Sequence, residues 1–397
     1  MDLVIRNVRL IDGTESAPVA KVSVEVADGA ISWIGDETAR PPRRVHREDI
    51  NGQGLTLIPG LMDCHEHFAG DGGPDNTERN RSDTPEGYAF LVVGNARRAL
   101  MSGVTSARDV GSPYGVTIQV AKETASGAVL GPRIVASGEW LSFPGTTWVP
   151  GVGTRLSRRV ETMEDMVLAI HEQIEMGAGL IKVGANGRRP DGEYYGSLGP
   201  EVLAAAVGAA HGSGLKIAAH CMGFEASRQA VEAGIDSIEH GIHLDDETVR
   251  LMAEKGTYLV PTLSIWDIRE RMDNQNAVPN DQRSENLERK EHSLASFRRA
   301  MQAGVKIATG TDAGGSPVRH GFVAREIELM VQAGMAPQAA LEASTRVAAD
   351  LLGVREQTGT IEVGKRADMV LVDGDPHSDP AALRNIWAVF LGGRRVL

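Results

Sequence analysis

Alternating apolar and polar positions mark both ends of the chain. Within residues 3–13 and 21–36, valine and isoleucine alternate with polar residues, the period-two pattern of half-buried strands. Asp28 and Gly29 separate two of these runs and predict a tight type I′ hairpin turn. The last 37 residues, 361–397, show the same pattern. We therefore predict one small β domain made from residues 1–57 together with residues 361–397.

The long middle of the chain, residues 58–360, follows a different pattern. Helical residues lead to a glycine, then to a short apolar strand, then to a polar or glycine-rich turn. Residues 200–214 illustrate the helical part, because their apolar residues share one face and Gly214 ends the helix. Eight strands alternating with helices favour an α/β fold, a closed (β/α)8 TIM barrel, over an open doubly wound sheet. The eight instances are residues 55–67, 101–111, 129–140, 175–187, 212–223, 232–241, 254–263 and 302–314.

Side chains suited to binding metal stand at the predicted carboxyl ends of five strands. His65 and His67 lie two residues apart, so both imidazoles point to one face of the first strand. Each residue has an ordinary alternative role, such as a hydrogen-bonded core histidine or a helix-capping aspartate. Convergence at one mouth of a barrel favours a metal site instead. The remaining members are Lys182, His220, His240 and Asp312.

Composition and charge exclude several classes of protein. The chain has 397 residues, a formal net charge of -12 and no large basic cluster, so nucleic acid is not an expected partner. The N-terminus lacks the pattern of a signal peptide, and no apolar run is long enough to cross a membrane. Cys64 and Cys221 are too few for a disulfide framework and are expected to be buried as small apolar side chains. We expect a cytoplasmic protein without membrane contact.

These motifs resemble the amidohydrolase superfamily. Its members combine a (β/α)8 barrel with a small β-sandwich formed by both termini, and the resemblance covers nearly the whole chain. It implies that His65, His67 and Asp312 hold one divalent metal ion and that His220 and His240 hold a second. Lys182, carboxylated by CO2, would bridge the two ions. Zinc suits these ligands best, with cobalt, manganese or iron as substitutes.

The stretches "GLMDCHEHF", "SGVTSARDVG", "GLIKVGANG" and "GTDAG" are similar to the prolidase-like branch of this superfamily. That branch includes Xaa-Pro dipeptidases, carboxypeptidases acting on C-terminal lysine or arginine, and enzymes that hydrolyse N-acyl amino acid amides. The resemblance implies a binuclear amidohydrolase that cleaves a dipeptide or an N-acyl amino acid through a metal-bridging hydroxide. Asp312 would serve as the catalytic base and then as the acid. It also implies a homo-oligomer.

Residues of the substrate side are less sharply defined by the sequence. Arg188 and Arg189 follow the Lys182 strand, where a guanidinium could clamp a substrate carboxylate, although both could equally be solvated loop residues. Tyr195 and His320 are similar to substrate-side positions of the prolidase-like branch. A lactonase or organophosphate hydrolase is an alternative activity for the same site. A noncatalytic, hydantoinase-like interaction protein is the alternative outside enzymes.

Overall fold

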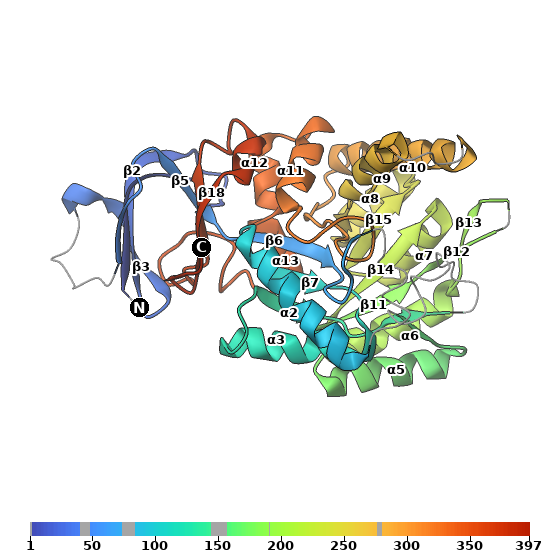
Figure 1. Cartoon of the computed structure of the whole chain (residues 1–397). Coiled ribbons are helices and arrows are strands. Elements are labelled where there is room, and N and C mark those ends of the chain that lie inside the picture. The colour runs from blue at the N-terminus through green and yellow to red at the C-terminus, as the bar shows by residue number, and fades with distance from the viewer. Residues whose placement is uncertain (1, 40–47, 74–83, 144–156, 190, 276–279) are drawn as a thin grey trace.

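Two sets of strands organise the molecule, one formed by the chain termini and one by the middle of the chain (Figure 1). The computed structural model describes every residue except 1, 40–47, 74–83, 144–156, 190 and 276–279. Strands from the two ends of the chain lie together on one side of the molecule, and the helix-rich middle lies on the other.

The terminal strands form one eight-stranded sheet in the order β19-β18-β17-β5-β1-β2-β3, with β4 also paired to β1. Asp28 and Gly29 join β2 to β3 with φ of 51° and 83°, which confirms the predicted type I′ turn. The sheet contains β1 (Leu3–Leu10), β2 (Val19–Ala27), β3 (Ala30–Asp36), β4 (Glu48–Asn51), β5 (Leu55–Pro59), β17 (Met369–Asp373), β18 (Ile386–Leu391) and β19 (Arg394–Arg395).

Strand β5 connects this sheet to the rest of the fold. It pairs in parallel with β1 and antiparallel with β17, and Leu57 packs against Met369 and Phe390 in the core of the sheet. Gly60 alone separates it from the next strand, which carries His65. The first predicted metal-binding motif therefore follows directly from a strand that is hydrogen-bonded on both sides.

The middle of the chain contains parallel strands in two hydrogen-bonded groups, β6-β7-β8 and β10-β9-β11-β14-β15-β16. Residues 305–313 run between the groups, because Ile307 bridges to Leu259 and Ala313 bridges to Glu66, both in parallel. The strands are β6 (Leu61–Glu66), β7 (Val104–Asp109), β8 (Arg133–Ala136), β9 (Trp140–Ser142), β10 (Ser157–Arg159), β11 (Leu180–Gly184), β14 (Lys216–Met222), β15 (Ser237–Ile242) and β16 (Tyr258–Val260). The parallel α/β architecture predicted for the middle of the chain is confirmed.

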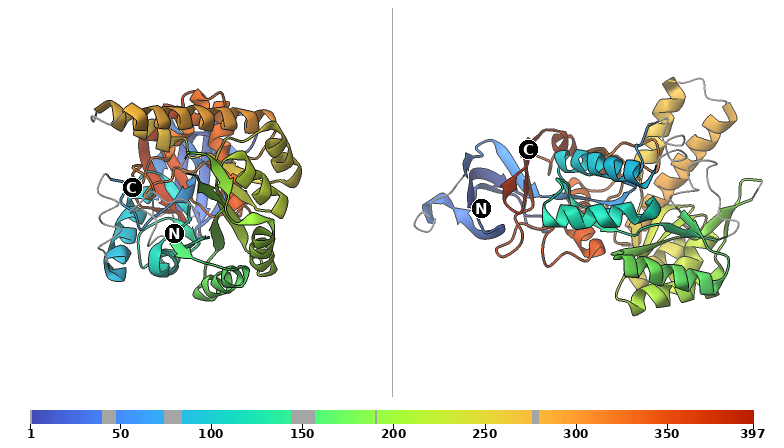
Figure 2. Two further views of the ribbon diagram at one scale, coloured as in Figure 1. Left: turned by 90° about the vertical axis from the view of Figure 1, so that its right-hand side faces the viewer. Right: turned by 60° about the horizontal axis from the view of Figure 1, so that its bottom comes forward.

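Helices cover the outside of these parallel strands, as the end-on view in Figure 2 shows. They are α2 (Pro85–Met101), α3 (Val116–Ser126), α5 (Met163–Met176), α6 (Gly199–Gly212), α7 (Phe224–Ala233), α8 (Asp246–Lys255), α9 (Ser264–Gln275), α10 (Asn280–Gln302), α11 (Val323–Gln332), α12 (Pro337–Ala343) and α13 (Arg346–Leu352).

The repeated pattern of helix, glycine and strand has a clear local cause. In α6, Leu203, Ala206 and Ala210 are buried, so one apolar stripe packs the helix onto the strands, as predicted. Helices α5 and α7 end at Gly177 and Gly234, which adopt positive φ and turn the chain toward the next strand.

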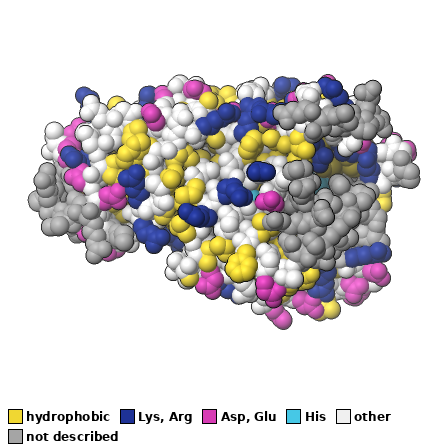
Figure 3. All heavy atoms as spheres, in the orientation of Figure 1, with side chains coloured by type: hydrophobic (Ala, Val, Ile, Leu, Met, Phe, Trp, Pro, Cys, Tyr) yellow, Lys and Arg dark blue, Asp and Glu magenta, His cyan; other side chains and the backbone are white. Residues whose placement is uncertain are grey.

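In the coloured part of the face shown in Figure 3, both Lys and Arg side chains and Asp and Glu side chains reach the surface. Within the described part of the chain, no helix combines the length and the apolar character needed to span a lipid bilayer.

Candidate metal centre

His65, His67 and Asp312 form a compact buried cluster at the carboxyl end of β6. Each offers one ligand atom, and these atoms lie within 4.8 Å of one another. Asp312 Oδ1 is 3.3 Å from the Nε2 atom of each histidine. Two imidazoles and a carboxylate at such distances can share one divalent metal ion.

The other two predicted histidines continue this cluster. The His65 ring centroid lies 5.4 Å from that of His67 and 4.8 Å from that of His240. The His240 ring in turn lies 4.6 Å from the ring of His220. Four imidazoles from β6, β14 and β15 therefore form one continuous row.

Lys182 on β11 completes the cluster. Its side chain is fully buried, and Nζ has no hydrogen-bond partner among the residues that the structure describes. Burial lowers the pKa of Lys182 to about 8. An isolated buried ammonium is unfavourable, whereas an amine converted to a carbamate could be neutralised by metal ions. The donor set and this unpartnered amine thus fit the predicted pair of metal ions.

Trp140, which the sequence did not point out, lies against several of these groups. Its ring centroid is 5.1 Å from that of His220 and 6.4 Å from that of His67. Lys182 Nζ lies 5.5 Å from the same ring. Trp140 therefore forms an apolar wall beside the predicted ligands. The fold brings all six of these residues together, and their roles as ligands stay predictions.

Hydrogen bonds fix the orientation of three of the imidazoles. Nδ1 of His65 lies 2.7 Å from Glu239 Oε2, Nδ1 of His67 lies 2.8 Å from the Gly111 carbonyl oxygen, and Nδ1 of His240 lies 2.7 Å from Thr262 Oγ1. With Nδ1 engaged in each ring, Nε2 is left as the ligand atom, and in His65 and His67 it lies 3.3 Å from Asp312 Oδ1. Partners of this kind are typical of metal-binding histidines.

Glu239 and Arg108 form a buried ion pair behind His65, and neither was identified from the sequence. Arg108 donates to Glu239 Oε1 at 2.5 Å and to Ser237 Oγ at 3.0 Å. Burial alone would raise the pKa of Glu239, but the charges of Arg108 and Lys182 hold it well below its ordinary value. The only clue in the sequence was a charged side chain inside each of two apolar strands.

We expect the substitution Glu239→Gln to weaken zinc binding by about 10- to 100-fold, because His65 loses its charged partner. Competition with a fluorescent zinc chelator measures this affinity. Glu201→Gln on the exposed face of α6 serves as the matched control and should leave zinc affinity unchanged. Equal zinc affinity of the Glu239→Gln variant and the unmodified protein would contradict the orienting role of this carboxylate.

Backbone conformations at the cluster are unusual. Thr262 has φ of 49°, rare for a β-branched residue, and its hydroxyl meets His240. Asp312 has φ of 56°, and its backbone N–H donates to the His65 carbonyl oxygen at 2.7 Å. Burial alone would raise the pKa of Asp312, but hydrogen bonds from His65 and His67 hold it well below its ordinary value. Asp312 is therefore ionised.

The predicted substrate-side residues after β11 lie on a hairpin of β12 (Asn186–Arg188) and β13 (Tyr194–Gly196). Arg188 forms an ion pair with Glu285 on α10, and Arg189 pairs with Glu193 at 3.4 Å. Arg189 also lies 5.2 Å from the ring centroid of Tyr195. Both arginines therefore have carboxylate partners within the protein, and the substrate roles of these residues and Tyr195 stay predictions.

His320 is buried between two other segments. Its Nδ1 lies 2.8 Å from Glu66 Oε2, and its Nε2 lies 2.9 Å from the Gly70 carbonyl oxygen. Burial raises the pKa of Glu66 to about 8 and lowers the pKa of His320 to about 4, which favours a neutral pair. His320 thus ties the loop after β6 to the loop after residue 313, and its substrate role stays a prediction.

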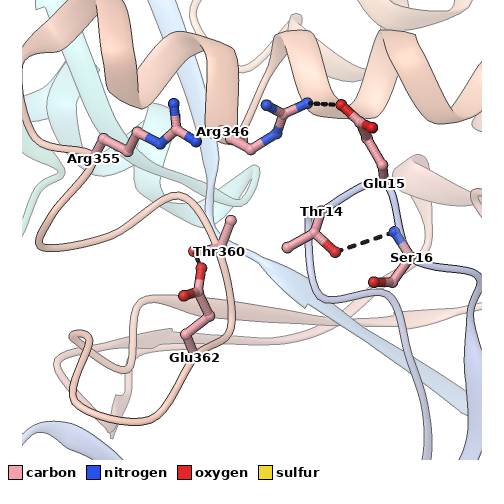
Figure 4. A pocket seen from close by; sticks show the side chains of 7 residues that line it. All are labelled: Thr14, Glu15, Ser16, Arg346, Arg355, Thr360 and Glu362. Atoms are coloured by element: carbon pink, nitrogen blue, oxygen red, sulfur yellow. Dashed lines mark hydrogen bonds and ion pairs between the residues drawn. The ribbon is translucent and has the colours of Figure 1, made fainter.

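Away from the metal cluster, a hollow of about 480 Å³ lies between the terminal sheet and α13 (Figure 4). Its arginines are matched by carboxylates: Arg346 pairs with Glu342 at 2.7 Å, and Arg355 pairs with Asp350 at 2.9 Å. The charge of this hollow is balanced, and we assign no site to it. It is lined by Thr14, Glu15, Ser16, Arg346, Arg355, Thr360 and Glu362.

Comparisons with known proteins give one family match and several similar proteins. The model of the amidohydrolase family matches residues 56–396. An ochratoxinase from Aspergillus niger is 29% identical over 95% of this chain and 84% of its own length. Its crystal structure has a TM-score of 0.86 and 26% identity, covering 99% of this chain and 95% of the other. A solved Xaa-Pro dipeptidase with methionine in its active site has a TM-score of 0.87 and 30% identity, covering 100% and 99%.

Proposed function

Because this chain belongs to the amidohydrolase family and is a hydrolase of C–N bonds, we propose that it cleaves the amide bond of a dipeptide or an N-acyl amino acid. The observation that carries the proposal is the gathering of His65, His67 and Asp312 within 4.8 Å beside the unpartnered amine of Lys182. The similarity to a dipeptidase with an amino acid in its active site supports the substrate class.

We assign two divalent metal ions, most suitably zinc, to this cluster. His65, His67 and Asp312 would hold one ion, His220 and His240 the other, and Lys182 would bridge them as its carbamate. Carbamate formation joins the neutral amine to CO2 with release of a proton, and burial favours the neutral amine. When bound, such ions lower the pKa of water and polarise the carbonyl oxygen of the substrate.

The side chains of the protein supply the remaining steps. Asp312 accepts the proton of the attacking water and delivers it to the nitrogen of the leaving amine. Its low pKa keeps it ionised and ready to accept that proton. Glu239 and Arg108 hold His65 in place, and Trp140 keeps bulk water from one side of the cluster.

The fold proposed for this activity is a closed barrel with an attached β-sandwich. Besides the two bridges of residues 305–313, Gly179 N–H donates to the Ala136 carbonyl oxygen at 2.8 Å, which supports a link between β8 and β11. We propose residues 58–360 as the catalytic barrel and residues 1–57 with 361–397 as the sandwich. A cytoplasmic location and a homo-oligomeric state stay predictions.

A kinetic screen tests the proposed activity. Metal-reconstituted enzyme is assayed with L-Xaa-L-Xaa dipeptides and N-acyl amino acids, and in parallel with lactones and a paraoxon-type triester. We expect kcat/KM of about 10⁴ M⁻¹ s⁻¹ or more for the best amide substrate, as in ordinary enzymes. Chelation should abolish this activity, and zinc with bicarbonate should restore it. Turnover confined to lactones or triesters would contradict the proposal.

A further inference from the structure

Helix α9 carries two buried N–H donors that lack acceptors. Arg269 Nε and Trp266 Nε1 are both buried, and neither has a hydrogen-bond partner among the described residues. The two residues are one helical turn apart, and the Arg269 guanidinium lies 5.9 Å from the Trp266 ring centroid. Buried N–H groups are unfavourable unless something accepts from them.

These donors lie beside the metal cluster. Helix α9 begins two residues after Thr262, whose hydroxyl is hydrogen-bonded to His240, and Trp266 belongs to a small buried cluster with Ile265 and with Ile242 at the end of β15. Burial and the charge of Arg289 lower the pKa of Arg269, and the charges of Asp312 and Asp273 act in the opposite direction. The Arg269 guanidinium therefore lies within the electrostatic range of the predicted ligand Asp312, without an ion pair to any described carboxylate.

Other arginines around this mouth are already neutralised by the protein. Arg188 and Arg289 share Glu285, and Arg271 pairs with Asp267 at 2.9 Å. Arg269 differs from them in having a buried donor atom and no carboxylate partner among the described residues. An unmatched guanidinium next to a catalytic cluster is suited to bind an anionic group of the substrate.

We propose that Arg269, assisted by the indole N–H of Trp266, binds the free carboxylate of the leaving amino acid. This inference rests on the proposed function and narrows its substrate class. The enzyme would require a free carboxylate on the amine side of the scissile amide, as dipeptides and N-acyl amino acids have. Arg188 and Arg189, which the sequence suggested for this role, instead have protein partners.

Binding of an amino acid tests this assignment without turnover. The metal-loaded enzyme is titrated calorimetrically with L-methionine and with L-methioninol, in which an alcohol replaces the carboxylate. We expect L-methionine to bind at least about 10-fold more tightly. Arg269→Met should weaken L-methionine binding by about 10- to 100-fold and leave L-methioninol unchanged, as expected when a charge-assisted hydrogen bond is lost.

Two further variants separate this role from a structural one. Arg269→Lys retains the charge and should restore part of the affinity for L-methionine. Arg271→Met removes an exposed arginine from the same helix and should change nothing. Three results would each overturn the assignment. Arg269→Met could weaken the binding of both ligands equally, or leave L-methionine binding unchanged, or the unmodified enzyme could fail to bind L-methionine.

Kinetics distinguish a failure of this inference from a failure of the proposed function. With the best amide substrate of the screen, Arg269→Met should raise KM by about 10- to 100-fold and change kcat only a few-fold, because carboxylate binding is shared by ground and transition states. If the enzyme binds L-methionine through Arg269 but hydrolyses no amide, the proposed function fails and the carboxylate site stands. If the enzyme hydrolyses amides but substitution of Arg269 does not change the kinetics, the proposed function stands and the carboxylate site fails.

Discussion

Replacing Lys182 by methionine should abolish amide hydrolysis and at the same time stabilise the metal-free protein. Methionine keeps most of the apolar volume of the side chain but can neither form a carbamate nor carry charge. We expect kcat/KM to fall by at least about 10³-fold, which corresponds to about 4 kcal/mol of lost transition-state stabilisation. Zinc bound per chain should fall as well, since the proposed bridging ligand is removed.

The gain in stability follows from the buried amine. Lys182 Nζ has no hydrogen-bond partner in the described part of the chain, and burial lowers its pKa from 10.5 to about 8. A lysine whose pKa is depressed in the folded state destabilises the protein fully below the folded pKa, and this penalty disappears as the pH rises through the unfolded value. Near neutral pH the penalty amounts to about 3 kcal/mol. Metal-free Lys182→Met protein should therefore melt a few degrees higher at pH 7, and the difference should shrink above pH 8.

Lys216 offers the matched control. It lies on the neighbouring strand β14, and its Nζ donates to the Leu351 carbonyl oxygen at 2.9 Å. Burial lowers the pKa of Lys216 as well, but its ammonium donates to the Asp350 and Leu351 carbonyl oxygens, and methionine cannot replace these hydrogen bonds. Lys216→Met should therefore lower the melting temperature and leave bound zinc unchanged. If metal-free Lys182→Met were less stable than the unmodified protein, burial of the Lys182 amine would not carry the net penalty described above.

The substitution Asp312→Asn should reduce amide hydrolysis far more than ester hydrolysis. The side chain keeps its shape but loses its negative charge and can no longer carry a proton to the leaving group. An amine must be protonated to leave, whereas an alkoxide needs that help less. Loss of a general acid and base costs about 10²- to 10⁴-fold, so we expect a fall in kcat/KM near the upper end for the amide. For the matching ester, we expect the factor by which kcat/KM falls to be about 10 to 100 times smaller.

Asp312 is also a proposed ligand, so zinc content must be measured for the same preparation. Asp245→Asn, at the N-cap of α8, removes a carboxylate elsewhere while asparagine still caps the helix. It should leave both rates unchanged. Equal losses for amide and ester at normal zinc content would contradict the proton-transfer role and leave Asp312 as a ligand only.

Much of the fold was predictable because its cues are local. The Asp28-Gly29 turn, the alternating strands of both termini and the buried stripe of α6 each depend on residues close together in the chain. The convergence of His65, His67, Lys182 and Asp312 was also predictable, because parallel strands place their carboxyl ends at one edge. Buried Cys64 and Cys221 agree with the expectation of small apolar side chains.

The long-range partners of polar side chains could not be predicted from the sequence. Nothing near Arg188 in the chain indicates that it pairs with Glu285, 97 residues away, and nothing near His320 indicates Glu66. Any of several arginines around the mouth could have been the one left without a carboxylate.

The sequence by itself thus determined the parallel α/β architecture and indicated six candidate ligands on or just after the parallel strands, since both follow from periodicity and strand direction. Only the tertiary structure decided which polar groups face one another: Glu239 and Arg108 behind His65, Trp140 beside Lys182, and Arg269 without a carboxylate partner among the described residues. The physical reason is that a buried charge pairs with the groups that packing brings within a few ångströms of it. The spacing of residues along the chain does not encode which groups these are.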